Sequence, residues 1–381
     1  MRIVRGSFDS DGGGKTSLCG TCGKRCRGWY DQSERLVRDL DCGPWRIYLR
    51  ICVRRVRCPR CCAVKTERLE FLADINRYTQ RYAEWIGRQC REKSIKAVAE
   101  ETNLGWDSVK DLDKLYMAKQ LEAHPIEPPK RIGIDELAIG RGHSYRILIH
   151  DLDRKRPIWF GDDRGRSREA IDAYFQSLSD TERAGIELGV MDMYPPYRAS
   201  LEANCPNAVV HYDHFHLVKH LGEAIDKVRK SEYKRMEGSQ RRYIKGSKYI
   251  LLAHRSNLDA KGRRTLDELL RVNRRLSKAY LLKESFNRIW TYKSEGWARR
   301  FFDQWKESLK WQRLEPLEKF ARLVESHWDG IVRALDPKCK VPMGFVEGMN
   351  SKIRAIQKRS YGIRDEDYLR LKILTSTLPK L

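Results

Sequence analysis

The sequence predicts a multi-domain α/β protein, and three features carry this prediction. Eight of the 11 cysteines fall between Cys19 and Cys62, which indicates a local metal-binding region. After the proline-containing segment AHPIEPPK, the pattern changes from helices to strands. A later stretch rich in Lys, Arg, Leu and Glu favours helices. We therefore expect an N-terminal zinc ribbon and a helix pair, followed by a sheet that an all-helical insertion interrupts.

The net charge points to a nucleic-acid partner. The 381 residues include 76 Lys and Arg against 52 Asp and Glu, a formal charge of +24, which disfavours an ordinary metabolic enzyme. Such a surplus attracts phosphates, and 17 Tyr and 10 Trp offer stacking surfaces. A basic protein that is merely soluble, such as a ribosome-associated factor, is the alternative. No apolar run approaches the length of a membrane span, so we expect a cytoplasmic protein that joins the nucleoid when bound to DNA.

Two C-x-x-C pairs define the first domain, which we place at residues 1–70. Cys19 and Cys22 form one pair, and Cys58 and Cys61 form the other. Four thiolates at this spacing predict a closed, structural Zn²⁺ site. Cys62 is an alternative to Cys61 as the fourth ligand. A disulfide framework is disfavoured in a reducing compartment.

A strand is expected between the two cysteine pairs. Its apolar residues alternate with polar ones from Trp45 to Arg54, which gives the strand one apolar face. The opposite face carries arginines that are candidates for contacts along a DNA backbone: Arg46, Arg50 and Arg54.

Residues 71–124 are predicted to form a helix-turn-helix. Ser94 is placed to cap a helix, and Asn103 can take the left-handed conformation that ends it. A second helix begins near Trp106 and would enter the major groove, with Trp106 and Lys110 as candidate DNA contacts. Simple packing of a helical hairpin is the alternative. Pro125, Pro128 and Pro129 then mark a domain boundary.

Residues 130–230 are predicted to form the first part of a catalytic core. Strand and helix patterns follow one another in the order β-β-β-α-β-α-β, which is that of a ribonuclease H-like fold. Asp135 lies in the middle of the first strand and Asp192 at the end of the fourth. In such a sheet these two carboxylates meet over the same edge.

Paired carboxylates favour metal-dependent phosphoryl chemistry. Two Mg²⁺ or Mn²⁺ ions prefer hard oxygen ligands and assist in-line displacement at phosphorus. Glu347 is the candidate third carboxylate, on a helix in the segment 341–381 that completes the core. Arg354 and Lys358 follow on the same helix face, where they are candidates for binding flanking phosphates.

An insertion is implied because Asp192 and Glu347 are 155 positions apart in the chain. Residues 231–340 contain almost no proline before Pro316 and are predicted to form an all-helical domain. Five of the ten tryptophans lie there, and most of them are expected in its core.

These stretches together resemble the bacterial insertion-sequence transposases of the DDE class, and more narrowly the ISL3 family. The matching segments are the cysteine pairs, the helix-turn-helix, IGIDE around Asp135, the block from Val190 to Lys230, and FVEGMNSKIRAIQKRSYGIR around Glu347. The block from Val190 is the most specific of these, because it joins Asp192 to a D-x-x-H element, Asp213 to His216.

The resemblance implies a function and a set of roles. It makes Asp135, Asp192 and Glu347 the catalytic Mg²⁺ ligands, and places Asp213 and His216 near the active site as accessory residues. It makes residues 1 to about 120 the binder of the terminal inverted repeats of an insertion sequence. It implies metal-dependent cleavage and strand transfer by a homodimer or higher homo-oligomer on double-stranded end and target DNA. In related helical inserts an aromatic residue stacks on an unpaired base, a role for which Trp297 is the candidate here.

Two other functions remain open on the sequence. One is a transposase-derived regulator that binds DNA without cutting it, although the three acids weigh against this. The other is a structure-specific nuclease on the same fold, such as a Holliday-junction resolvase. Covalent catalysis through Tyr361, as in tyrosine recombinases, is disfavoured because the carboxylate chemistry needs no side-chain nucleophile.

Overall fold

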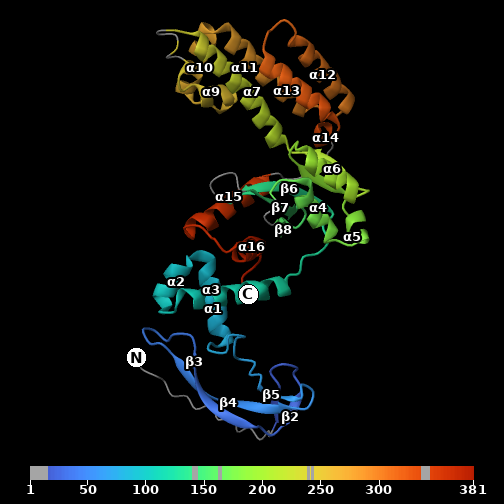
Figure 1. Cartoon of the computed structure of the whole chain (residues 1–381). Coiled ribbons are helices and arrows are strands. Elements are labelled where there is room, and N and C mark those ends of the chain that lie inside the picture. The colour runs from blue at the N-terminus through green and yellow to red at the C-terminus, as the bar shows by residue number, and fades with distance from the viewer. Residues whose placement is uncertain (1–15, 140–144, 162–164, 238–240, 242–243, 336–343) are drawn as a thin grey trace. The chain divides into compact units, whose positions relative to one another are not determined.

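The computed structural model describes residues 16–139, 145–161, 165–237, 241, 244–335 and 344–381. The chain divides into two compact units, which Figure 1 labels by element. Unit 1 contains the residues up to Ile126 together with Ser351–Leu381, and unit 2 contains Glu127–Asn350. The boundary falls within a helix, so the segment 341–381 contributes residues to both units. The first 15 residues and Cys339 lie outside the described residues.

Unit 1 begins with short antiparallel sheets. Strands β1 (Thr16–Leu18) and β2 (Arg25–Arg27) pair with each other. Strands β3 (Asp31–Arg38), β4 (Tyr48–Cys58) and β5 (Ala63–Thr66) form a second sheet with β4 in the centre. The apolar face predicted for the central strand is present, because Ile51 and Val53 are buried with Val37. The strand begins later than predicted, and Trp45 and Arg46 lie outside it; Trp45 is exposed.

Three helices follow in unit 1: α1 (Gln80–Glu92), α2 (Ile95–Thr102) and α3 (Trp106–Ala123). The predicted caps are confirmed, since the Ser94 hydroxyl accepts the N–H of Ala97 and Asn103 ends α2 at φ 55°. Helices α1 and α3 approach closely at Gly87, where an added Cβ atom would lie 2.1 Å from the ring of Tyr116. Glycine is therefore required at this helix crossing.

The C-terminus packs against the helix-turn-helix. Helix α16 (Glu366–Leu374) contacts α3, and the second half of α15 (Gly344–Arg359) precedes it in the chain. The buried Lys372 ammonium lies 2.5 Å from the buried carboxylate of Asp113, to which the Tyr368 hydroxyl also donates a hydrogen bond. Residues more than 250 positions apart therefore share one polar network in unit 1.

Unit 2 is built on a mixed five-stranded sheet with the order β10-β9-β6-β7-β8. Its strands are β6 (Arg131–Ala138), β7 (Tyr145–Asp151), β8 (Arg156–Phe160), β9 (Leu188–Met191) and β10 (Val209–Tyr212). Strands β6, β9 and β10 are parallel, whereas β7 pairs antiparallel with β6 and β8. Helices α4 (Arg168–Gln176), α5 (Asp180–Ala184) and α6 (Pro195–Asn204) connect these strands. The predicted order of strands and helices is confirmed, with α5 as an additional short helix.

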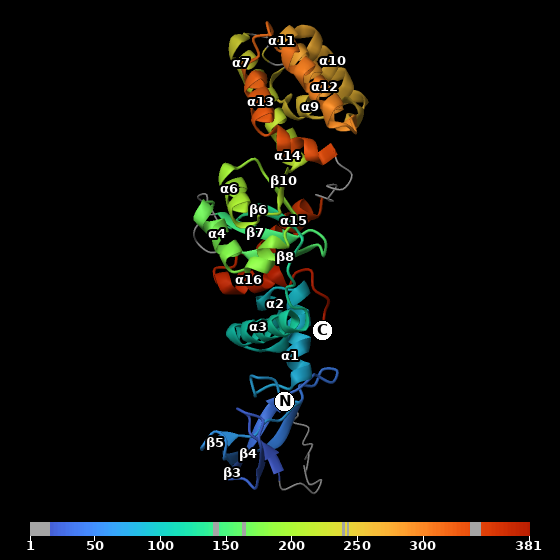
Figure 2. The ribbon, with the colours of Figure 1, turned by 90° about the vertical axis from the view of Figure 1, so that its right-hand side faces the viewer.

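The sheet is covered on both faces. Helices α4 and α6 lie on one side and α15 on the other in both Figure 1 and Figure 2. Ile132 and Ile134 of β6 belong to the core that includes α4 and α6. Between them, Gly133 faces the other side, where Val346 of α15 packs with Val190. Side chains at alternate positions of β6 thus face different layers.

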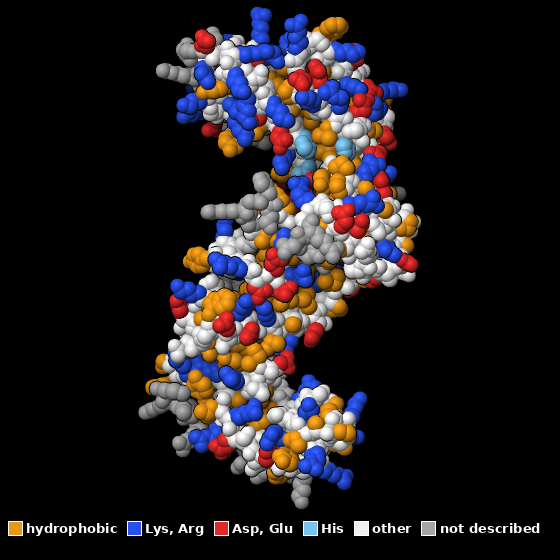
Figure 3. All heavy atoms as spheres, viewed as in Figure 1, with side chains coloured by type: hydrophobic (Ala, Val, Ile, Leu, Met, Phe, Trp, Pro, Cys, Tyr) orange, Lys and Arg blue, Asp and Glu red, His pale blue; other side chains and the backbone are white. Residues whose placement is uncertain are grey.

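The described residues that follow β10 form helices up to Leu335. They are α7 (His214–Arg235), α9 (Lys248–Leu252), α10 (Ala260–Val272), α11 (Arg274–Phe286), α12 (Glu295–Ser308), α13 (Glu315–Ser326) and α14 (Trp328–Val332), with short 3-10 turns at Arg255–Asn257, Asn287–Thr291 and Arg333–Leu335. Of the five tryptophans expected mostly in this core, Trp305 is buried, Trp290 and Trp328 pack against the core partly buried, and Trp297 and Trp311 are exposed. Lys and Arg side chains are frequent on the surface of these helices in Figure 3. Among the described residues, no helix has the length and hydropathy required to span a bilayer.

Candidate functional site

Asp135 lies within β6, and Asp192 and Asp213 directly follow the parallel strands β9 and β10. Strand β6 pairs with β9 at a constant offset, Arg131 with Leu188 and Gly133 with Val190, and extending this offset by two residues aligns Asp135 with Asp192. Strand β10 pairs with β9 in the same way, and the N–H of Asp213 donates to the carbonyl of Met191 at 2.9 Å. Neighbouring strands are about 4.8 Å apart, so the register brings the three carboxyl groups to one edge of the sheet.

Helix α15 faces these aspartates from the side of Val346. Asn350, on the next turn of α15, is buried, and its amide donates to the Asp135 carboxylate at 2.5 Å. Glu347 is exposed at the N-terminal end of the same helix. Asn350 carries no sequence signal of its own, because a single asparagine within a helix has many structural roles. Only the strand and helix packing identifies it.

The pKa values of Asp135 and Asp213 show that the acids of the site are buried and interact. Burial raises the pKa of Asp135, and the charge of Asp213 adds to this effect. Burial also raises the pKa of Asp213, with further contributions from the charges of Glu347 and Asp192. Hydrogen bonds from backbone N–H groups and the nearby His216 oppose both shifts. A cation bound among these groups would relieve the repulsion.

The D-x-x-H element begins helix α7. The Asp213 side chain caps this helix by accepting the N–H of Phe215 at 2.9 Å. His216 follows one turn later, with Nδ1 at 3.8 Å from the Asp213 carboxylate. The spacing of this element thus places its histidine beside the carboxylate group. His214 instead points to Trp290, with ring centroids 4.2 Å apart, as expected for a structural histidine.

A glutamate and an arginine on the opposite face of β6 were not predicted as site residues. Glu136 accepts hydrogen bonds from the Tyr197 hydroxyl at 2.7 Å and from Nε of Arg166 at 2.6 Å. Burial raises the pKa of Glu136, and the charge of Asp192 contributes to this. The Arg166 guanidinium also lies over the ring of Tyr194, 5.1 Å from its centroid. Arg166 is therefore a fixed cation near Asp192.

The four predicted cysteines meet in unit 1. The Sγ atoms of Cys19, Cys22, Cys58 and Cys61 all lie within 4.8 Å of one another. The N–H of Cys61 donates to Sγ of Cys58 and lowers the pKa of that thiol to about 6. Cys62 is exposed at φ 51°, outside this group, so the geometry selects Cys61 over Cys62. Four thiols in this arrangement match the donor set and tetrahedral geometry that Zn²⁺ requires.

The candidate carboxylate ligands are not packed together as the four cysteines are. Over the described ranges, no set of three or more His, Cys, Asp or Glu other than the cysteines brings all its ligand atoms within 4.8 Å. Asp135, Asp192 and Glu347 are therefore more widely spaced than the ligands of a single compact ion site. Their oxygen donors still match the preference of Mg²⁺. The buried Oδ1 of Asn350 has no hydrogen-bond partner among the described groups and offers a further oxygen beside Asp135.

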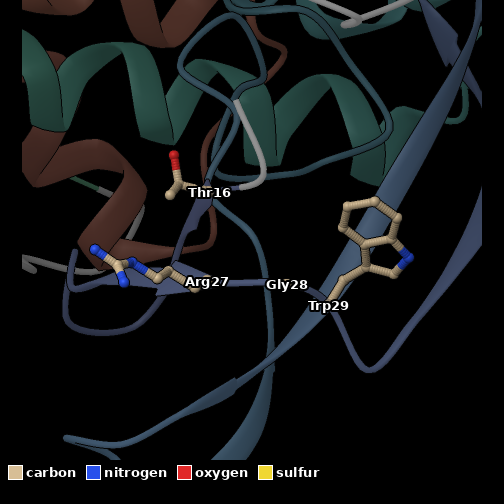
Figure 4. Close-up of a pocket in the computed structure, with 4 residues that line it drawn as sticks. All are labelled: Thr16, Arg27, Gly28 and Trp29. Carbon is tan, nitrogen blue, oxygen red and sulfur yellow. The ribbon is translucent and has the colours of Figure 1, made fainter. Parts of the chain in front are cut away.

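The surface of the N-terminal sheets combines arginines with exposed aromatic rings. Arg54 stacks over the exposed Trp29 ring at 4.5 Å, and Arg50 is 3.6 Å from Glu34. Figure 4 shows Arg27 and Trp29 at an open pocket of about 690 Å³, on either side of Gly28. Arg50 and Arg54 thus lie on the exposed side of β4, whereas Arg46 precedes the strand.

The remaining predicted DNA contacts lie on helices. Trp106 is exposed at the start of α3, but the Lys110 ammonium is 2.7 Å from the Asp365 carboxylate and only 18% of the side chain is exposed. Arg354 and Lys358 are exposed on α15. Trp297 is exposed on α12, with the Arg300 guanidinium 5.1 Å from its ring centroid.

Comparison with known proteins identifies the class. A family model described as "Transposase" matches residues 132–373, and a model described as "Helix-turn-helix domain of transposase family ISL3" matches residues 67–117. The chain therefore belongs to the ISL3 family of transposases. It is 34% identical to the transposase for insertion sequence element IS1001 of Bordetella parapertussis over 94% of this chain and 88% of the relative. It is 26% identical to the transposase for IS1557 of Mycobacterium tuberculosis over 92% of this chain and 83% of the relative.

Proposed function

We propose that this transposase binds the terminal inverted repeats of an insertion sequence and cuts and joins DNA at a metal-dependent carboxylate site. The catalytic core has a ribonuclease H-like fold in this proposal, and residues 231–340 form an all-helical insertion in it. The observation that carries the proposal is the shared register of Asp135, Asp192 and Asp213 at one edge of three parallel strands. A purely structural sheet gains nothing from placing three acids at adjacent positions, since their charges oppose one another.

Asp135, Asp192 and Glu347 would hold two Mg²⁺ or Mn²⁺ ions. Two such ions, when bound, stabilise the attacking and leaving oxygens of an in-line displacement at phosphorus. Asp213 and His216 are accessory groups, which add charge next to the ligands without an assigned proton transfer.

The residues around the acids position them and the DNA. Asn350 orients Asp135 through its amide, in the way that hydrogen bonds to metal ligands commonly do. Arg166, held by Glu136, lies where a cation can bind a phosphate next to the reacting one. Water first hydrolyses the phosphodiester at each element end and leaves a 3′-hydroxyl. That hydroxyl then attacks a target phosphodiester, forms a new ester bond and displaces a target 3′-hydroxyl.

Unit 1 would recognise the inverted repeats. Helix α3 enters the major groove, and the arginines of β4 together with Arg46 contact the backbone. The cysteine cluster holds a structural Zn²⁺ that fixes the N-terminal strands.

Trp297 contacts an unpaired base, and Arg354 and Lys358 bind flanking phosphates. Because two ends are joined in one reaction, the active species is a homodimer or a larger homo-oligomer.

The test uses DNA that flanks the reading frame, incubated with the purified protein with and without added Mg²⁺ or Mn²⁺. Metal-dependent cuts at the tips of the inverted repeats support the proposal. Binding to the tips without cuts would favour the DNA-binding regulator. Preferential cutting of a four-way junction, in competition with the repeat duplex, would favour a structure-specific nuclease.

A further inference from the structure

A groove of about 520 Å³ runs along helix α7 in unit 2, where α9 and α11 form its other wall. We call it the α7 groove and define it by Phe215, Val218, Lys219, Lys227, Lys230 and Lys248. It begins at the candidate catalytic site, because the N–H of Phe215 donates to Asp213 and the Phe215 ring contacts the ring of His216. One end of the groove therefore lies next to Asp213 and His216.

The groove lining carries an excess of positive charge. Five lysines line it against two acids, Glu223 and Asp226. The buried Asp226 is neutralised by Arg229 at 2.7 Å and by Lys230 at 3.0 Å. Lys283 is buried as well, and its ammonium donates to three carbonyls at the end of α9.

The lysines that face solvent are the ones available to a ligand. Lys219 and Lys227 are exposed, and no described carboxylate lies within salt-bridge distance of either. They are eight residues apart on α7, which corresponds to about 12 Å along the helix. Figure 3 shows that Lys and Arg side chains also gather on the outer surface of these helices.

One side of the groove is apolar. Phe215 is 52% exposed and Val218 is 38% exposed, one turn apart on the same face of α7. Large apolar side chains exposed next to unpaired lysines are typical of a surface that contacts bases and phosphates of a single strand together. The bases of a continuous duplex are stacked inside the helix and do not offer their faces to such a wall.

We propose that the α7 groove binds an unpaired DNA strand that extends from the candidate catalytic site. Phe215 and Val218 contact its bases, and Lys219, Lys227 and Lys248 bind its phosphates. The inference rests on the proposed function for the position of the strand, but it concerns binding and not cutting. It assigns the part of α7 from Phe215 to Lys227 and the start of α9 to DNA.

The experiment measures the affinity of the full-length protein for two fluorescent duplexes of the same inverted repeat, one blunt and one with a single-stranded tail at the cut position. Mg²⁺ and Mn²⁺ are omitted so that no cutting occurs, and the salt concentration is varied. The variants are Lys219→Ala with Lys227→Ala, and Phe215→Ala. The matched control is Lys261→Ala with Lys278→Ala, which removes the same charge from exposed positions of α10 and α11 outside the groove.

The lysine pair should lower affinity for the tailed duplex roughly 10-fold and reduce its salt slope by about 1.4, since each single-strand phosphate contact contributes about 0.7. Phe215→Ala should lower the affinity for the tailed duplex and leave the affinity for the blunt duplex unchanged. The control pair should bind both duplexes as the wild type does. Equal losses on blunt and tailed DNA would overturn the proposal in favour of a duplex contact, and unchanged affinity would also overturn it. If tail binding follows these expectations while the wild type cuts nothing in Mg²⁺, the proposed function fails and the groove assignment stands.

Discussion

Asp192 and Asp213 follow two adjacent parallel strands at equivalent positions, and the N–H of Asp213 hydrogen-bonds to Met191, the residue before Asp192. The sequence places 20 residues between the two aspartates, but the strand register makes them neighbours. Burial raises the pKa of Asp213, and the charges of Glu347 and Asp192 add to this effect. Such an arrangement of acids is favourable where cations are bound.

Asn350→Ala should lower metal-dependent end cleavage about 10- to 100-fold, because Asp135 loses the amide that orients it. Binding of the inverted-repeat duplex should not change, since Asn350 is buried and does not face DNA in this account. Asn257→Ala, at an exposed position between α9 and α10, is the matched control. Cleavage by Asn350→Ala at the rate of the wild type would show that the hydrogen bond has no role in the reaction.

Cys58→Ser should remove the bound zinc, because four thiolates are needed to close the tetrahedral site. Zinc content measured by mass spectrometry of the purified protein should fall from one ion per chain towards none, and duplex binding should fall with it. Cys62→Ser should keep one zinc ion per chain, because Cys62 lies outside the cluster. Loss of zinc in Cys62→Ser, or its retention in Cys58→Ser, would contradict the ligand assignment.

Breaking the buried pair of Asp113 and Lys372 should destabilise unit 1 strongly. Lys372→Met leaves the Asp113 charge buried without its ammonium partner, which costs about 3–5 kcal/mol in the free energy of unfolding. The double variant Asp113→Leu with Lys372→Met should recover much of that loss, because neither charge then remains. Urea denaturation of the single and double variants measures both values. If the double variant lost as much free energy of unfolding as the two single variants together, the two side chains would not form a stabilising pair.

The pH dependence of unit 1 should show the contribution of Asp365. Hydrogen bonds from Lys110 and Lys114 hold the pKa of Asp365 well below its ordinary value. The carboxylate therefore stabilises the folded state above about pH 4 and loses this effect as the pH falls below it. The difference in melting temperature between the wild type and Asp365→Asn should be largest near pH 6 and shrink towards pH 3. A difference that stays constant over this range would rule out the ion pairs as its source.

Trp297→Ala should reduce end cleavage without changing the melting temperature, because the side chain is 61% exposed and contributes little to the core. Trp311→Ala is the matched control, at a position 93% exposed in the turn that follows α12. Full cleavage activity in Trp297→Ala would contradict the proposed stacking of Trp297 on an unpaired base. A similar loss in Trp311→Ala would show that the effect is not specific to Trp297.

The features that could be predicted from the sequence are those with local periodicity or fixed spacing. The alternation around Asp135 and the apolar run before Asp192 predict their strands, and the caps of Ser94 and Asn103 delimit α2. The cysteine pairs predict their own cluster, although only the geometry separates Cys61 from Cys62.

The features that could not be predicted depend on contacts between distant segments. The packing of α16 on α3 joins residues more than 250 positions apart, and no local pattern near Lys372 indicates Asp113 as its partner. This packing also explains why Lys110, predicted as a DNA contact, is instead paired with Asp365 in the structure. Glu136 and Arg166 meet only because β6 presents alternate residues to opposite layers.

The role of the carboxylate site is tested directly by comparing the wild type with Asp192→Ala on inverted-repeat DNA, with Mg²⁺ or Mn²⁺ added or omitted, on a sequencing gel. We predict metal-dependent cuts at the repeat tips by the wild type, and none by Asp192→Ala, although the variant binds the same DNA with equal affinity. Cuts at the same positions by Asp192→Ala would contradict the assignment of the carboxylate site.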